Sequence, residues 1–161
     1  MKFDELDLLM IMDASDIEYS SLSEDTLTQL ALGDELYIAN YALAELSARG
    51  SKQASVIADK ILSSSIGDDY LQSAALRVLF GTNKEKALNY ITQQVQSCNL
   101  LVLNEIIELI IENVSDFTST IPSFLINFVS ERLKKLDDKQ DFIDHKVRDE
   151  FLSLYGGMAL T

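Results

Sequence analysis

The sequence is poor in the residues on which many catalytic and metal sites depend. Its 161 residues include one cysteine, Cys98, one histidine, His145, one proline and no tryptophan. A lone cysteine excludes an internal disulfide framework and a zinc site of the Cys-x-x-Cys type. We expect Cys98 to be a small buried hydrophobe rather than a reactive thiol.

One group of side chains still has the spacing of a metal site. Asp141, His145 and Asp149 lie four residues apart on an expected helix, so they can approach one ion. Their basic neighbours Lys146 and Arg148 favour a mixed salt-bridge face instead, and a zinc site needs further histidine or cysteine ligands. The one pair of adjacent glycines follows the last expected helix and is no phosphate-binding loop. We therefore expect no metal, no cofactor and no enzymatic activity.

Long apolar runs and a basic N-terminus are missing as well. No run approaches the roughly 18 residues that a membrane span needs. The sequence opens MKFDE, which is acidic where a signal peptide is basic. We therefore expect a cytoplasmic protein that has no membrane partner.

What the chain has in excess is negative charge. It carries 26 acidic and 13 basic residues, a formal net charge of -13. Residues 1–48 hold eleven carboxylates and one lysine, and residues 87–131 hold five carboxylates and no lysine or arginine. Nucleic acids and anionic membranes bind through lysine and arginine, which are few in this chain. We therefore expect neither a nucleic acid nor a membrane as a direct partner. The partner that this charge favours is a basic protein.

Apolar residues recur at the spacing of amphipathic helices, and no strand-like alternation persists. The pattern predicts an all-α fold with helices near 3–13, 24–32, 35–49, 52–65, 69–80, 84–98, 100–114, 121–136 and 141–155. Four glycines are expected to end helices in the left-handed conformation: Gly33, Gly50, Gly67 and Gly81. The expected N-caps that follow them are Asp34, Ser51, Asp68 and Asn83. Another start is marked by Thr120, Ile121 and Pro122.

Two helix pairs match each other at an offset of 33 residues. Nine positions pair in this way: Glu35, Tyr37, Ile38, Ala42, Leu43, Leu46, Ala54, Ala58 and Leu62 align with Asp68, Tyr70, Leu71, Ala75, Leu76, Leu79, Ala87, Ile91 and Val95. The repeated small residue at Ala42 and Ala75 is informative, because close helix crossings favour a small side chain. A helix–turn–helix unit at this period indicates an α-solenoid.

The segment from about 34 to 98 resembles HEAT-like repeats, with Ala-Leu-x-x-Leu at 42–46 and again at 75–79. The resemblance implies a right-handed solenoid of about nine helices in antiparallel pairs. It implies one domain over 1–161, with capping helices in 1–33, helical hairpin repeats in 34–136 and a capping helix at 141–155. Tetratricopeptide and ankyrin repeats are disfavoured, because their tryptophan and Thr-Pro-Leu-His signatures are absent.

Acidic pairs stand at the starts of successive first helices. Asp34-Glu35 and Asp68-Asp69 would lie along one edge of a solenoid, each pair close to a tyrosine, Tyr37 or Tyr70. One interpretation is ordinary capping and dipole complementarity, which is worth about 0.3–1 kcal/mol each. The other is an acidic-and-tyrosine edge that contacts the lysines and arginines of a partner.

A second candidate surface follows the Ile-rich helix near 100–114. Glu105, Glu108 and Glu112 have i, i+3, i+7 spacing and no basic neighbour in sequence. Such a row is either a solvated helix face or a concave acidic stripe that receives a cationic surface.

In size, charge and helical-repeat architecture the chain resembles the CdiI-type immunity proteins of bacterial contact-dependent growth inhibition. The resemblance implies a cognate partner, the toxin domain of a secreted effector, which we expect to be a basic ribonuclease. It implies a 1:1 heterodimer in which the acidic surface occludes the active-site cleft of the toxin.

Two other functions are weighed against this one. A HEAT-like adaptor would join two proteins without inhibiting either. A HEAT-like DNA glycosylase would need a basic groove facing the DNA, which the charge of this chain opposes.

Overall fold

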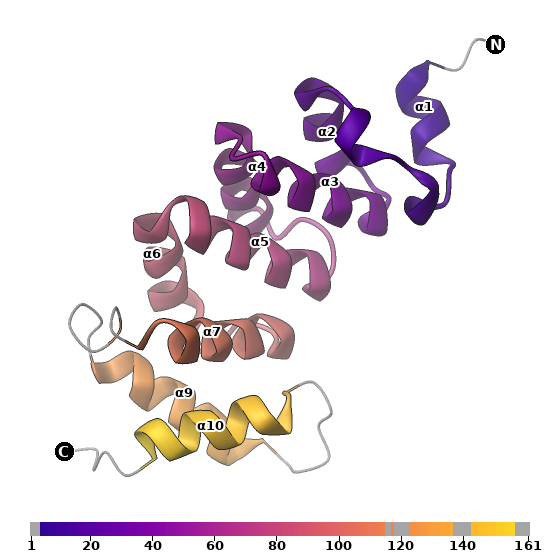
Figure 1. Ribbon diagram of the computed structural model, residues 1–161. Helices are drawn as coiled ribbons and strands as arrows, with labels where there is room; N and C mark the ends of the chain where they lie inside the picture. Colours follow the sequence, from indigo (N-terminus) through magenta and orange to yellow (C-terminus); the bar gives the residue numbers. More distant parts are fainter. Residues whose placement is uncertain (1–3, 115–116, 118–122, 137–142, 157–161) are drawn as a thin grey trace. The chain divides into compact units, whose positions relative to one another are not determined.

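The computed structural model describes residues 4–114, 117, 123–136 and 143–156, and the regular structure in these ranges is helical, with no strand. The all-α prediction is confirmed. The helices are α1 (Glu5–Met10), α2 (Glu24–Ala31), α3 (Leu36–Ala48), α4 (Lys52–Ser63), α5 (Asp69–Thr82), α6 (Lys84–Gln94), α7 (Leu100–Glu112), α9 (Ser123–Lys135) and α10 (His145–Tyr155) (Figure 1). Two 3₁₀ turns, η1 (Ala14–Asp16) and η2 (Tyr19–Ser21), connect α1 to α2.

The chain divides into two compact units, Met1–Ala87 and Leu88–Thr161. In the first unit α3 packs against α2, α4 and α5, while α2 also contacts α4 and α4 contacts α5. In the second unit α10 packs against α7 and α9. In the part of the chain that is described, no helix has both the length and the apolarity of a membrane span.

Side-chain caps begin most of the helices, as the sequence predicts. Ser51 and Asp68 cap α4 and α5 by accepting hydrogen bonds from the backbone N–H groups of Gln53 and Leu71. At Asn83, Oδ1 accepts from a backbone N–H in the first turn of α6. These bonds satisfy donors that have no partner within the helix.

Asp34 is not the cap of α3, contrary to the prediction. The N-cap is Glu35, whose side chain makes no capping hydrogen bond. Glutamate is a poor N-cap, because its longer side chain does not fold back onto the first turn as aspartate or serine does. The pair Asp34-Glu35 is therefore not explained by capping.

Of the four expected helix-ending glycines, two have the left-handed conformation. Gly50 and Gly67 have φ of +66° and +76°. Gly81 lies inside α5, because backbone hydrogen bonding continues past the end of the apolar stripe to Thr82. Gly33 closes α2 through its N–H to Leu30 O (3.0 Å) without a positive φ. The prediction is wrong for these last two glycines.

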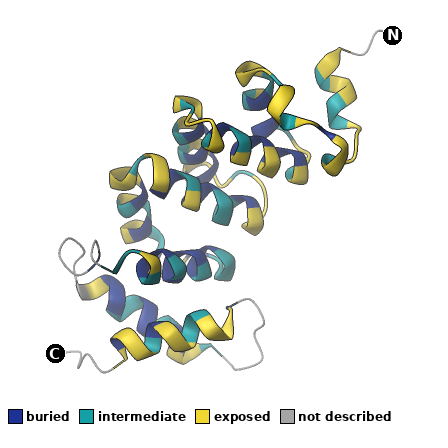
Figure 2. Cartoon of the chain, in the orientation of Figure 1, coloured by how far each residue is buried: buried dark blue, intermediate teal, exposed yellow. Residues whose placement is uncertain are grey.

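Burial follows the 33-residue offset. The seven apolar pairs aligned above are all buried, among them Ala42 with Ala75 and Leu46 with Leu79. The two remaining pairs, Glu35 with Asp68 and Tyr37 with Tyr70, are all exposed. Figure 2 shows this alternation as dark blue faces turned toward neighbouring helices and yellow faces turned outward. The predicted start at Thr120–Pro122 lies outside the described residues, as does Asp141.

Candidate functional site

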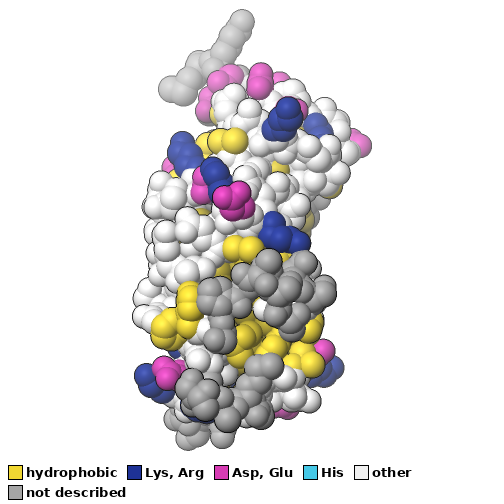
Figure 3. All heavy atoms as spheres, turned by 90° about the vertical axis from the view of Figure 1, so that its left-hand side faces the viewer, with side chains coloured by type: hydrophobic (Ala, Val, Ile, Leu, Met, Phe, Trp, Pro, Cys, Tyr) yellow, Lys and Arg dark blue, Asp and Glu magenta, His cyan; other side chains and the backbone are white. Residues whose placement is uncertain are grey.

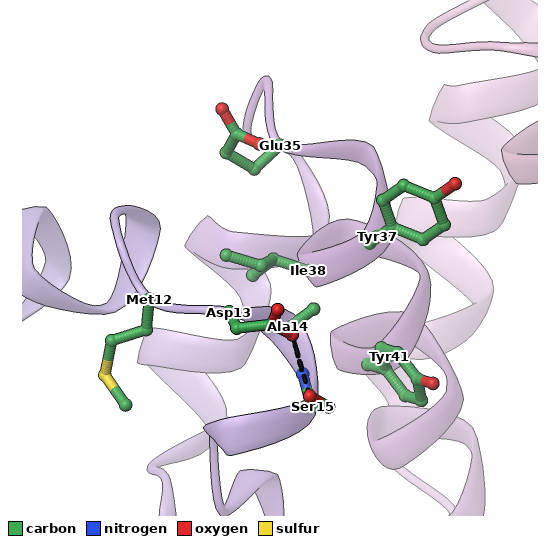
Figure 4. Close-up of a pocket in the computed structure, with 8 residues that line it drawn as sticks. All are labelled: Met12, Asp13, Ala14, Ser15, Glu35, Tyr37, Ile38 and Tyr41. Atoms are coloured by element: carbon green, nitrogen blue, oxygen red, sulfur yellow. Dashed lines mark hydrogen bonds between the residues drawn. The ribbon is translucent and has the colours of Figure 1, made fainter.

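A pocket of about 400 Å³ lies between the end of α1, the turn η1 and the first half of α3. Its walls are Met12, Asp13, Ala14, Ser15, Glu35, Tyr37, Ile38 and Tyr41. Figure 4 shows Tyr37 and Tyr41 one helical turn apart on α3, with Glu35 at the beginning of that helix. We call this depression the polar pocket.

A second depression of about 250 Å³ lies where the first turns of α3 and α5 meet. It is lined by Leu36, Tyr37, Asn40, Asp68, Tyr70 and Leu71. We call it the tyrosine groove. Since Tyr37 lines both depressions, its side chain is the wall that they share.

Large aromatic side chains are unusually exposed around these depressions. Tyr37 is 80% exposed, Tyr70 66% and Tyr41 52%. Tyrosine has an apolar ring and a polar tip, so a partner that covers such rings gains apolar burial without an unsatisfied hydroxyl. Exposed aromatic residues in a row are a common feature of protein-binding surfaces.

The groove has a rigid floor. Asp68 Oδ1 accepts from the N–H of Leu71 at 2.9 Å, which holds the carboxylate at the start of α5. Beside it the backbone of Gly67 approaches two leucines of the floor, since a Cβ at this position would lie 2.6 Å from Leu71 Cδ2 and 3.3 Å from Leu36 Cδ2. A glycine is required here by its positive φ and by this close contact.

The polar pocket is supported through Tyr41 by the segment that precedes α2. Tyr41 stacks on Tyr19, with ring centroids 5.5 Å apart and an interplanar angle of 24°. The segment that carries Tyr19 is held by Arg49, whose guanidinium donates to the carbonyl oxygens of Tyr19 (2.9 Å), Ser20 (3.0 Å) and Leu22 (2.9 Å). Arg49 also pairs with Glu45 at 2.7 Å. One arginine thus fixes the position of the ring beneath Tyr41.

Both depressions are anionic. The backbone N–H and hydroxyl of Ser15 donate to Asp13 Oδ1 at 3.0 and 2.7 Å and lower the pKa of this carboxyl. No lysine or arginine is among the residues that line either depression in the described structure. The first unit as a whole has 15 acidic and seven basic residues. On the face seen in Figure 3, in contrast, Lys or Arg side chains lie beside Asp and Glu, so that the charges there are mixed.

The structure brings four of the predicted edge residues together and separates two others. Glu35 and Tyr37 line the polar pocket, and Tyr37, Asp68 and Tyr70 line the tyrosine groove. Asp34 and Asp69 are exposed but line neither depression.

The other lining residues were not predicted as site residues, among them Asp13, Asn40 and Tyr41. Of these, Tyr41 carries a sequence signal, because it follows Tyr37 by four residues and therefore shares its helix face. Neither Asp13 nor Asn40 carries one.

The glutamate row on α7 is not a uniformly exposed stripe. Glu105 is buried, with 8% of its surface exposed, whereas Glu108 is half-buried and Glu112 exposed. Glu108 Oε1 accepts from Asn104 Nδ2 at 2.8 Å. Glu105 is buried because α7 is apolar on most of its circumference, so that most of the helix around Glu105 is covered as well.

Cys98 is buried, as the sequence predicts, and His145 lies at the surface. Burial raises the pKa of the Cys98 thiol, and Arg132 Nη1 donates to its Sγ at 3.2 Å. His145 is exposed at the start of α10, where Asp144 caps the helix. Among the residues that the structure describes, no three histidine, cysteine or acidic side chains are grouped as metal ligands.

Comparison with known protein families, with curated proteins and with solved structures finds no match to this chain.

Proposed function

We propose that this protein binds a basic protein domain through the polar pocket and the tyrosine groove, and that the bound domain is a toxin that it neutralises. The observation that carries the proposal is the exposure of Tyr37 (80%) and Tyr70 (66%) beside carboxylates, with no basic side chain in either lining. Large rings left in water beside uncompensated negative charge favour a partner that brings both apolar area and positive charge.

Binding would proceed in two physical stages. The net charge of -13 attracts a basic domain over a distance of about 8 Å at physiological salt and raises the association rate by roughly 10–10³ over a neutral pair. The tyrosine rings then supply the buried anchors on which residence time depends. In a nuclease, carboxylates such as Asp13, Glu35 and Asp68 would take the place of substrate phosphates and cover the cleft.

The same proposal includes the finer architecture. We propose a right-handed HEAT-like α-solenoid of antiparallel helix pairs, with caps in 1–33 and 141–155 and repeats in 34–136. The matched burial at an offset of 33 residues supports it, as do the contacts of α2 with α4 and of α3 with α5, which join alternate helices. We also propose that the protein is cytoplasmic, forms a 1:1 complex with its toxin and is not an enzyme.

The experiment is growth rescue in a bacterial host. The C-terminal domain encoded immediately upstream of this chain is expressed alone, with the wild-type chain, and with a Tyr37→Ala/Tyr70→Ala variant. We expect arrest with the domain alone, recovery with the wild-type chain and loss of recovery with the variant. Val56→Ala, which removes an apolar side chain that is 59% exposed on α4, is the matched control and should rescue fully.

Two results would contradict the proposal. Arrest that the wild-type chain does not relieve removes neutralisation as the function. A stable complex in which the partner keeps its activity identifies the chain as an adaptor instead.

A further inference from the structure

We propose that the tyrosine groove is a socket for one arginine side chain of the partner. This inference deepens the proposed function, since it names the group that the groove receives. It rests on three properties of the groove: its aromatic walls, its apolar floor and the position of its single carboxylate.

The walls and floor fit a long side chain with an apolar stem. Tyr37 and Tyr70 come from different helices and line the same depression of about 250 Å³. Leu36 and Leu71 belong to the same lining, and the side chains of both lie close to the backbone of Gly67. Lysine and arginine bury their methylene stems along such apolar surface and keep the charged group near polar atoms.

The polar atoms favour a cation with several N–H donors. Asp68 uses Oδ1 for the capping bond to Leu71, while Oδ2 accepts no hydrogen bond from any described residue. Asn40 lies in the same lining, and its side-chain amide has a carbonyl oxygen that can accept a further hydrogen bond. A guanidinium has five N–H donors in a fixed plane and stacks on tyrosine rings, whereas an ammonium offers a more strongly hydrated point charge. The groove therefore favours arginine over lysine.

Other occupants fit less well. A phosphate or carboxylate would be repelled by Asp68, and a purely apolar side chain would bury that carboxylate without a partner. A divalent metal ion would need more oxygen ligands than the single carboxylate of the groove provides. A segment of a basic protein that presents an arginine meets all three properties.

The test uses small probes and the full chain. N-acetyl-arginine methylamide is titrated into the isotope-labelled protein, and the ring resonances of Tyr37, Tyr41 and Tyr70 are followed by NMR. The matched probes are the lysine analogue and the citrulline analogue, which has the shape of arginine without its charge. We expect saturable shifts at Tyr37 and Tyr70 with arginine, binding at least threefold weaker with lysine, and no saturable shift with citrulline.

Two variants separate a specific contact from the general negative field. Asp68→Asn removes the charge but retains a good N-cap, so α5 stays folded. Asp69→Asn removes the neighbouring charge, which does not line the groove. We expect Asp68→Asn to weaken arginine binding at least fivefold and Asp69→Asn to change it less than twofold.

Equal shifts with citrulline, equal effects of the two variants, or the absence of arginine-dependent shifts would overturn the socket. These results are distinguishable from a failure of the proposed function. Growth rescue without arginine-specific shifts would support neutralisation and refute the arginine socket. Arginine-specific shifts without growth rescue would support the socket and refute neutralisation.

Discussion

Arg49 does not line the polar pocket, but its loss should disturb the pocket strongly. Its guanidinium makes three bonds of 2.9–3.0 Å to backbone carbonyls between residues 19 and 22, and this segment carries the ring that stacks beneath Tyr41. Hydrogen bonds to a charged group contribute about 1.5–3 kcal/mol when buried. The Arg49 side chain is 30% exposed, so water competes for its N–H donors and lowers the contribution of each hydrogen bond to about 1 kcal/mol. The pair with Glu45 adds about 0.3–0.5 kcal/mol.

Arg49→Ala should therefore lower the free energy of unfolding of the protein by about 3 kcal/mol. For a chain of this length, that loss corresponds to a fall in the melting temperature of about 6–12 °C. The assay is urea unfolding followed by tyrosine fluorescence, because the chain lacks tryptophan and four of its six tyrosines lie in residues 1–87.

Two matched variants give this prediction its controls. Lys52→Ala removes the same charge from an exposed position just beyond Arg49 and should change stability by less than about 0.5 kcal/mol. Arg49→Lys retains the charge without the planar fork and should fall between the two. If Arg49→Ala matched Lys52→Ala, the guanidinium would not be what holds this segment in place.

Two other predictions concern the floor of the groove and the buried thiol. Gly67→Ala should destabilise the protein by about 2–4 kcal/mol in the same urea assay, because it combines a positive φ with a Cβ placed 2.6 Å from Leu71 Cδ2. Gly50→Ala has a positive φ but no atom near its Cβ, so it should cost only about 1–2 kcal/mol. Equal losses in the two variants would refute the packing argument. Cys98 should react with a thiol reagent at pH 8 at least a hundredfold more slowly in the folded protein than in urea, and equal rates would contradict its burial. Because burial raises the pKa of the Cys98 thiol, the folded state favours the neutral thiol. The stabilisation that this gives is complete below the ordinary thiol pKa of 9.0 and is lost as the pH rises above it. The urea concentration at the unfolding midpoint should therefore fall between pH 9 and 10, and a rise would contradict the prediction.

The pattern of apolar residues was enough to predict the helices and the buried face of each. The burial of Ala42 and Ala75 follows from the local spacing of apolar residues. The same burial pattern recurs 33 residues later, in the next helix pair. The limits of helices were less predictable, because they depend on single backbone hydrogen bonds. Gly81 and Glu35 show this: one lies within a helix that continues past its apolar stripe, and the other displaces Asp34 as the N-cap.

The site was predictable only as far as the repeat reached. Tyr37 and Tyr70 occupy equivalent positions, and the contact between α3 and α5 brings both to one groove. Asp13 precedes α3 by more than twenty residues and reaches the polar pocket through a 3₁₀ turn that no periodicity indicates. The burial of Glu105 likewise depends on which elements cover α7, and that is a tertiary property.

The most direct test of the proposed function is the affinity between this chain and the C-terminal domain encoded upstream of it, the proposed toxin, measured by calorimetry at 50 and 300 mM salt. We expect a 1:1 complex whose affinity falls with salt and is roughly a thousandfold weaker in Tyr37→Ala/Tyr70→Ala, since the two anchors together contribute about 4 kcal/mol. An affinity that is unchanged in this variant, while Val56→Ala also binds normally, would contradict this expectation.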